Sequence, residues 1–86
     1  MTSGHFKNDV WKWAERIKVK PREIHIRKMT KKWASCSSKG RLTFDTEVLD
    51  LPANKRNEII VHELLHLRYP SHNKMFHRMM ERYLKE

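Results

Sequence analysis

Residues 59–72 read IIVHELLHLRYPSH. Apolar residues at helical spacing predict a helix here, and Pro70 should end it near Tyr69, because a proline disfavours helical geometry in the residue before it. His62 and His66 are four residues apart, so they lie one turn apart on one face of this helix. Both imidazoles can therefore point at a single metal ion.

Glu63 is placed to act beside such an ion without binding it, because it lies about 100° round the helix from His62. A metal ion lowers the pKa of a bound water, and a neighbouring carboxylate can accept the proton that the water gives up. Nitrogen ligands in a tetrahedral site favour zinc. The HExxH pattern therefore predicts a zinc hydrolase with Glu63 as its catalytic base.

A third ligand is expected just beyond the helix. Ser71 is predicted to cap a last helix, which puts His72 in the first turn, where the helix dipole disfavours the imidazolium form. Metal binding needs the neutral imidazole, so His72 is the favoured third ligand. Glu81 and His77 stay as alternatives, since they share one face of the last helix. Three protein ligands leave a fourth position for water, as in catalytic zinc sites.

The start of the chain predicts an amphipathic helix that ends before Pro21. Ser3, Asn8 or Asp9 are its candidate caps. Trp11 lies off the apolar stripe and should be partly exposed. The stripe itself consists of Phe6, Val10, Trp13, Ala14 and Ile17.

Three short strands should follow, over residues 23–27, 32–36 and 41–45. Gly40 supplies the positive φ that a turn between the second and third strand needs. Consecutive strands of this kind suggest an antiparallel meander with one covered face. The predicted fold is α+β: an N-terminal helix, a three-stranded antiparallel sheet, the HExxH helix and a C-terminal helix.

The C-terminal helix carries an apolar stripe that is expected to belong to the core. The stripe consists of Met75, Phe76, Met79, Met80, Tyr83 and Leu84.

The length of 86 residues fits one small domain, 1–86, with a thin core. The net charge of +9 belongs to residues 1–41, which hold twelve Lys and Arg against three acidic residues. Such an excess is typical of a solvated face, and it also suits an anionic partner such as nucleic acid. The first twenty residues contain no apolar signal segment, and no apolar run could span a membrane.

A single cysteine, Cys36, excludes an intramolecular disulfide and suits a reducing compartment, so we expect a cytoplasmic protein. We also expect a monomer. Three roles are open for Cys36: a small buried residue, a residue that lines the cleft, or a metal contact that silences the site. Tyr69 is a candidate donor to a developing oxyanion, although a Tyr at a helix end more often only packs.

Three blocks of the sequence resemble one family, the YgjP-like metallopeptidases. Trp33–Arg41 reads WASCSSKGR and resembles the family's WGSCS-x-x-G-x, with Ala34 where glycine is usual. His62–Leu67 resembles HEL-x-HL, and Ser71–Phe76 resembles NH-S-x-x-F. The blocks keep the family's order and approximate spacing, over roughly residues 10–84.

This resemblance implies a minimal zincin-like domain, related to SprT-like proteases, that hydrolyses peptide bonds in peptide or protein substrates. It implies zinc bound by His62, His66 and His72, with Glu63 as general base. The chain is also similar in size to the minigluzincins, whose third ligand is a glutamate, and this similarity supports Glu81.

Two other functions compete with a constitutively active protease. The first is a basic nucleic-acid-binding module with a structural or vestigial metal site, in which Trp11, Trp13 and Trp33 would stack on bases. The second is a latent protease that acts on nucleic-acid-associated proteins.

Overall fold

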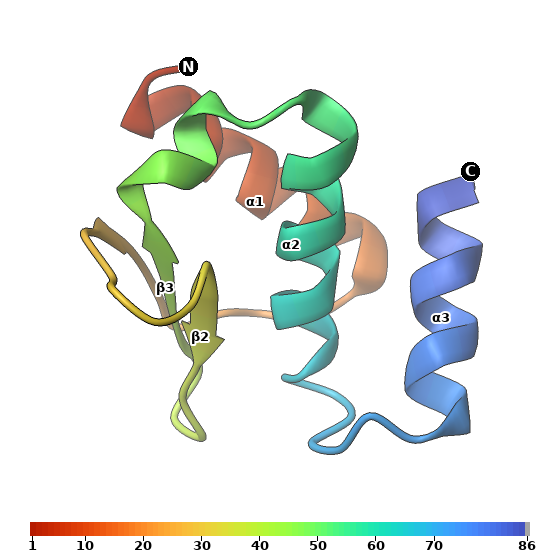
Figure 1. Ribbon diagram of the computed structural model, residues 1–86. Coiled ribbons are helices and arrows are strands. Elements are labelled where there is room, and N and C mark those ends of the chain that lie inside the picture. Colours follow the sequence, from red (N-terminus) through yellow and green to blue (C-terminus); the bar gives the residue numbers. More distant parts are fainter. Residues whose placement is uncertain (86) are drawn as a thin grey trace.

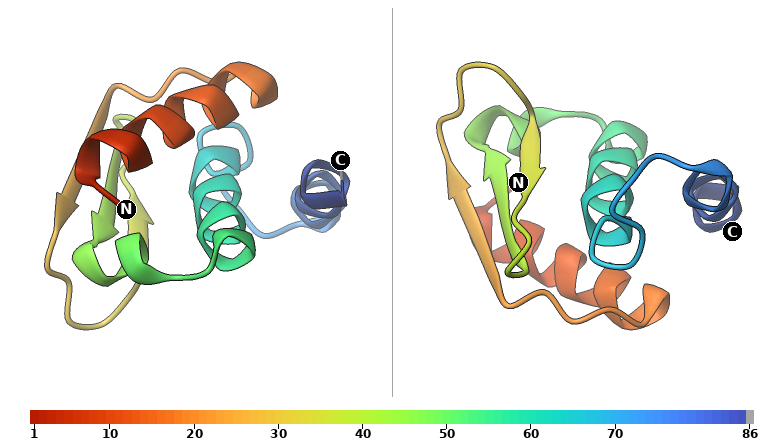
Figure 2. Two further views of the ribbon diagram at one scale, coloured as in Figure 1. Left: turned by 90° about the horizontal axis from the view of Figure 1, so that it is seen from above. Right: turned by 90° about the horizontal axis from the view of Figure 1, so that it is seen from below.

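The computed structural model describes residues 1–85, and its chain order is helix, three strands and two further helices (Figure 1). The elements are α1 (Ser3–Ile17), β1 (Glu23–Arg27), β2 (Ala34–Cys36), β3 (Arg41–Asp45), the 3-10 helix η1 (Thr46–Asp50), α2 (Ala53–Leu65) and α3 (Lys74–Lys85). The sheet, α2 and α3 stand side by side, and α1 lies across the sheet and α2 (Figure 2). The predicted α+β class is confirmed.

Helix α1 follows its predicted apolar stripe. The side chains of Phe6, Val10, Ala14 and Ile17 are buried, and Trp13 is half-buried. The ring of Phe6 meets Phe44 of β3 edge-on with centroids 4.9 Å apart, which joins α1 to the sheet. Trp11 is exposed, as predicted.

The cap of α1 differs from all three predicted residues. Thr2 caps the helix, because its Oγ1 accepts a hydrogen bond from the His5 N–H at 3.1 Å. The predictions of Ser3, Asn8 and Asp9 are therefore wrong. Threonine is a common cap, but one so close to the chain start gives a weak signal in the sequence.

The sheet is mixed, with β3 in the centre and the order β1-β3-β2. Strands β2 and β3 form the predicted antiparallel hairpin, with Gly40 at φ 88° in the turn. Strand β1 pairs with β3 in parallel, so the prediction of a wholly antiparallel meander is wrong. The edges of the sheet are β1 and β2.

The connections explain this topology. The chain reverses once between β1 and β2 and again between β2 and β3, so β1 and β3 run in the same direction. Residues 28–40 provide the long connection that a parallel pair requires. The buried Asp45 fixes this connection: its carboxylate accepts from the Met29 N–H at 2.8 Å, and its own N–H donates to the Trp33 carbonyl at 2.8 Å.

Helix α2 begins at Ala53, after Pro52 in the capping position, and ends at Leu65. This end is earlier than the predicted one near Tyr69. His66 is the C-cap residue and keeps helical dihedral angles, with φ −64° and ψ −20°. The four-residue relation between the two motif histidines is therefore retained.

Helix α3 is capped by Asn73 and not by the predicted Ser71. The Oδ1 atom of Asn73 accepts a hydrogen bond from the Phe76 N–H at 2.9 Å. His72 consequently precedes the helix and does not lie in its first turn. Asn and Ser are about equally good caps, so the sequence alone did not separate the two positions.

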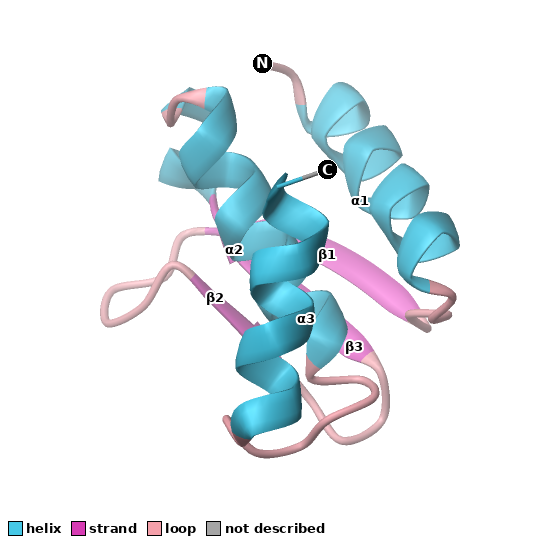
Figure 3. Cartoon of the chain, turned by 90° about the vertical axis from the view of Figure 1, so that its right-hand side faces the viewer, coloured by secondary structure: helices cyan, strands magenta, loops and turns pink. Residues whose placement is uncertain are grey.

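The apolar stripe of α3 is only partly covered. Phe76 is fully buried, whereas Met75 is 47% and Leu84 is 37% exposed. Met79, Met80 and Tyr83 are half-buried. Helix α3 is the outermost element and packs mainly against α2 (Figure 3), so the prediction that the whole stripe is core is wrong.

Candidate metal centre

Three imidazole nitrogens converge at one point beside the end of α2. The Nε2 atom of His62 lies 3.2 Å from Nε2 of His66 and 3.3 Å from Nε2 of His72. The Nε2 atoms of His66 and His72 are 3.0 Å apart. Three nitrogen ligands arranged tetrahedrally at about 2.0–2.1 Å from zinc would be separated by about 3.3 Å. The spacing of these side chains therefore fits a metal ion. Among residues 1–85, these three histidines are the group of side chains close enough together to bind one ion.

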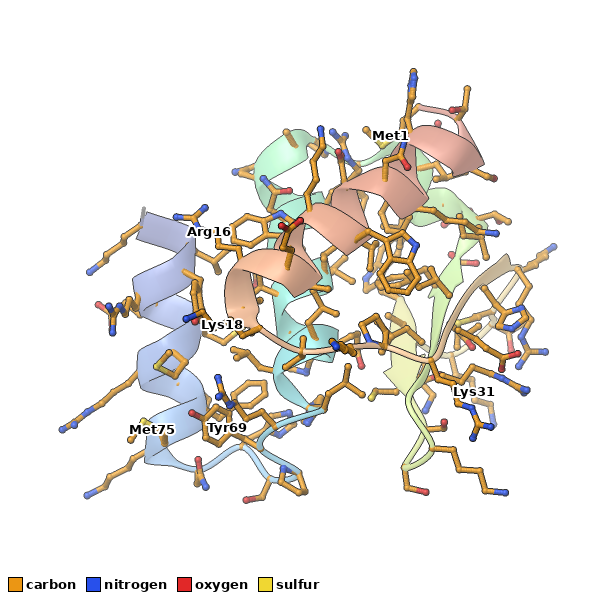
Figure 4. The ribbon with its side chains drawn as sticks, turned by 180° about the vertical axis from the view of Figure 1, so that it is seen from behind. Met1, Arg16, Lys18, Lys31, Tyr69 and Met75 are labelled. Carbon is orange, nitrogen blue, oxygen red and sulfur yellow. The ribbon has the colours of Figure 1, made fainter. Side chains whose placement is uncertain are left out.

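The orientation of His66 is fixed from its other side. Its Nδ1 lies 3.3 Å from the backbone carbonyl oxygen of Tyr69, to which it can donate a hydrogen bond. With the proton held on Nδ1, the lone pair of Nε2 is directed toward the centre. Tyr69 itself lies in the link between α2 and α3 (Figure 4). The Tyr69 backbone thus contacts the centre through His66, and the oxyanion contact of the Tyr69 side chain stays a prediction.

The surroundings favour the metal-binding form of His62 and His66. Burial lowers the pKa of His62, and the neighbouring imidazoles of His66 and His72 lower it further. Burial also lowers the pKa of His66, although its hydrogen bond to the Tyr69 carbonyl opposes this change. The lowered pKa of each residue favours its neutral ring at neutral pH.

Phe76 of α3 supports all three rings. Its ring centroid lies 5.2 Å from that of His62, 4.8 Å from that of His66 and 4.9 Å from that of His72. Its side chain is 1% exposed, so it cannot yield without disturbing the core. One aromatic side chain thus couples the packing of α3 to the position of each candidate ligand.

Glu63 is buried at 8% exposure next to this cluster. Burial raises the pKa of its carboxyl group to about 7, and the nearby Lys32 ammonium group works in the opposite direction. A carboxyl group with such a pKa can both accept and return a proton near neutral pH. No buried side-chain nitrogen or oxygen within the described residues lacks a hydrogen-bond partner or solvent contact.

The centre opens into a groove of about 550 Å³ between the HExxH helix and the β2–β3 hairpin. Its lining residues are Lys32, Ala34, Ser35, Cys36, Ser37, Ser38, His62, Glu63, His66, Pro70 and His72. Strand β2 is the sheet edge beside α2 (Figure 1), so the groove runs along a strand with a free edge.

Cys36 is half-buried and lines this groove. Burial raises the pKa of its thiol, and the Glu63 carboxylate raises it further. Metal ligation uses the thiolate, and the three-histidine group does not include Cys36. Of the three roles open for this residue, the structure favours the lining of the groove.

Comparison with known proteins assigns the chain to a family. The model of the YgjP-like metallopeptidase domain matches residues 2–86. The chain belongs to the YgjP-like metallopeptidases. The family identifies a metallopeptidase, and therefore a metal ion and a peptide or protein substrate.

A solved structure resembles this YgjP-like metallopeptidase closely in fold. It is the crystal structure of the metallopeptidase zymogen of Pyrococcus abyssi abylysin, with a TM-score of 0.78 and 26% sequence identity. The match covers 88% of this chain and 76% of that chain. The predicted minimal zincin-like fold is thereby confirmed. A search of the curated proteins finds no match.

The alternative third ligands of the YgjP-like chain lie outside the centre. Glu81 is exposed and its carboxylate pairs with the Lys85 ammonium group, which holds the pKa of Glu81 below its usual range. The ring of His77 is 6.4 Å from that of His72, measured between centroids, and it does not join the group of three. The structure brings His72 to the centre instead.

One of the three tryptophans of the basic half is engaged within the fold, and two are exposed. Trp13 is engaged within the fold: its Nε1 donates to Asn57 Oδ1 at 3.2 Å, and the Arg16 guanidinium lies over its ring at 5.1 Å. Trp11 and Trp33 are exposed. Within residues 1–85, no helix is long and apolar enough to cross a membrane.

Sequence reasoning missed two residues that organise the centre, Phe76 and Asn73, and one that organises the sheet, Asp45. Phe76 was assigned to the core without its link to the histidines, because a helical stripe does not show what a side chain packs against. Asn73 was overlooked as a cap, although an asparagine three residues before an apolar residue is a usable signal. Asp45 gave no signal, since its partners are distant backbone groups in the loop before β2.

Proposed function

We propose that this chain is a zinc-dependent peptidase in which His62, His66 and His72 hold the metal and Glu63 is the general base. The observation that carries the proposal is the convergence of three Nε2 atoms within 3.3 Å of one another beside a buried carboxyl group. Three protein ligands leave room for water, which distinguishes a catalytic zinc site from a closed structural one.

When bound, zinc would lower the pKa of a water molecule and polarise the carbonyl group of the scissile bond. Glu63 lies beside the histidines with a carboxyl pKa of about 7, so it can accept a proton from the attacking water. The same carboxyl group can then pass that proton to the nitrogen of the departing amine. The positive charge of a bound cation favours the ionised form that the first step requires.

The substrate would lie in an extended conformation along the free edge of β2. Peptides commonly bind to sheet edges by adding a strand, in which backbone hydrogen bonds give affinity and side-chain pockets give specificity. The short length of β2, Ala34–Cys36, limits this pairing to the residues closest to the scissile bond.

The test compares the wild type with Glu63→Gln, each loaded with zinc, on a mixed peptide substrate. The variant should bind one zinc ion per chain and lose about 10²–10⁴-fold in kcat, the usual contribution of a general base. Glu81→Gln, a carboxylate on the exposed side of α3, serves as the matched control and should keep both zinc and turnover. Full turnover by Glu63→Gln would refute the role of Glu63.

A latent form of the same enzyme is the second candidate, because the similar solved chain is described as a zymogen. Latency predicts that zinc binds fully while peptide turnover is low until the chain is cleaved or meets a partner. Turnover measured before and after limited proteolysis of the zinc-loaded chain separates the two forms. Equal turnover before and after would exclude latency.

A further inference from the structure

A second cavity opens next to the catalytic groove, and the proposed reaction does not use it. Its volume is about 230 Å³. It shares Ala34, His62 and Glu63 with the groove, so the two spaces meet at the base and at one ligand. Its remaining lining residues are Trp33, Glu58 and Ile59. It therefore lies at the end of the groove where β2 begins.

Three of the six residues that line this cavity are apolar: Trp33, Ala34 and Ile59. Trp33 is 42% exposed, whereas Ile59 is 9% and Ala34 is 8% exposed. The backbone of Trp33 is anchored, because its carbonyl oxygen accepts the hydrogen bond from Asp45 at 2.8 Å. An exposed indole face binds planar groups and cations well.

The Glu58 carboxylate places a negative charge in the wall of this cavity. Glu58 lies one turn before His62 on α2, and its side chain is 51% exposed. Its pairing with Lys55 at 3.7 Å is a surface contact that contributes little. No lysine or arginine lines this cavity within the described chain, whereas Lys32 lines the main groove. A cationic side chain is therefore favoured here over an anionic one.

The direction of the strand assigns this cavity to one side of the scissile bond. A peptide that pairs antiparallel with β2 runs from the Cys36 end toward Trp33. Antiparallel pairing is slightly more stable per residue than parallel pairing. The residue that follows the scissile bond then enters the cavity formed by Trp33 and Glu58.

We propose that the cavity formed by Trp33, Glu58 and Ile59 selects arginine as the residue on the C-terminal side of the scissile bond. This proposal rests on the peptidase function and names its substrate class. The planar guanidinium can stack on the Trp33 indole and pair with the Glu58 carboxylate, while its methylene groups lie against Ile59. Lysine offers no plane to stack, and leucine partly desolvates the Glu58 carboxylate without offering it a charged group.

Binding to the zinc-loaded Glu63→Gln variant tests the selection without requiring turnover. Four labelled peptides that differ only at this position, with Arg, Lys, Leu or Glu, are titrated and followed by fluorescence anisotropy. The peptide with Arg should bind about tenfold more tightly than that with Leu, with Lys in between, given the combined stacking and ion pairing. Equal affinities for Arg and Leu would overturn the proposal.

Charge reversal provides the matched comparison. Adding Glu58→Lys should reverse the order, so that the peptide with Glu binds better than that with Arg. Glu15→Lys on the exposed side of α1 makes the same change in net charge elsewhere and should leave the order unchanged. If both reversals act alike, the preference comes from net charge and the assignment is wrong. Peptide turnover by the wild type separately tests the peptidase function, so the two failures are distinguishable.

Discussion

Glu63 shows at the scale of one residue how burial serves chemistry and costs stability. Its carboxyl group has a pKa of about 7 because burial penalises the charged form. Next to a cation this penalty is offset, but in the metal-free protein it is not. The same residue should therefore weaken the metal-free fold at the pH where it acts as a base.

The stability of the metal-free protein should reveal this cost as a pH-dependent gap between wild type and Glu63→Gln. Below pH 4.5 the carboxyl group is protonated in both the folded and the unfolded state, so it adds no pH-dependent difference. Between pH 4.5 and about 7 the unfolded carboxyl ionises while the folded one keeps its proton, and wild type loses stability relative to the variant. Above pH 7 the loss is complete, at about 3 kcal/mol.

Urea unfolding at pH 4 and pH 8, in the presence of a chelator, measures this gap. The two proteins share every histidine, so the titration of the imidazoles cancels in the comparison. A gap in unfolding free energy that is the same at both pH values would contradict the raised pKa.

At the scale of elements, the link between α2 and α3 determines whether the centre is complete. Two candidate ligands are fixed by α2, since His62 is inside the helix and His66 is its C-cap. The third, His72, lies in the link, one residue before the Asn73 cap. The cap therefore holds the start of α3 and, with it, the position of His72.

Removing the cap should affect both folding and metal binding. Asn73→Ala is expected to lower the unfolding free energy of the metal-free protein by about 1 kcal/mol, the usual loss for a cap. It should also weaken zinc affinity, because His72 becomes less well positioned. Asn54→Ala is the matched control, since the Asn54 Oδ1 accepts a local hydrogen bond from the Lys55 N–H near the start of α2. A competition assay in which both variants bind zinc like the wild type would contradict this role.

The elements also show how far sequence reasoning reaches. The motif helix and α1 were predictable because their apolar stripes have the helical period, and β1 and β3 because Ile24, Ile26, Leu42 and Phe44 alternate. The parallel pairing of β1 was not predictable, because side-chain alternation is the same in parallel and antiparallel strands. It depends on Asp45, whose carboxylate bonds to the backbone of the loop after β1.

The candidate ligands were predictable from chemistry and spacing, whereas their common support, Phe76, requires the packed structure.

At the scale of the whole molecule, a bound metal would stabilise a fold whose core is small, in addition to its role in catalysis. Helix α3 packs mainly on α2 and leaves Met75 and Leu84 exposed, so its apolar contacts are limited. A metal ion bound by ligands from α2 and from the link would join the two helices. A ligand that binds only the folded state stabilises it by about 4 kcal/mol at a thousandfold excess over its Kd.

Zinc removal should therefore lower the Tm strongly. For a domain of this size, 1 kcal/mol corresponds to about 4–8 °C, so a shift of about 15–30 °C is expected between zinc-saturated and chelated protein. Scanning calorimetry measures the shift. His77→Ala removes a histidine outside the group of three, and this variant should show the same Tm shift as the wild type. An unchanged Tm on chelation would mean that the fold does not depend on the ion.

The measurement that tests the centre most directly is the identity and stoichiometry of the bound metal in wild type, His72→Ala, His77→Ala and Glu81→Ala. Elemental analysis after dialysis should find one zinc ion per chain in wild type and in the His77 and Glu81 variants. His72→Ala should retain far less than one, because its Nε2 atom is the third of the converging nitrogens. Full zinc occupancy in His72→Ala together with its loss in Glu81→Ala would contradict the three-histidine centre.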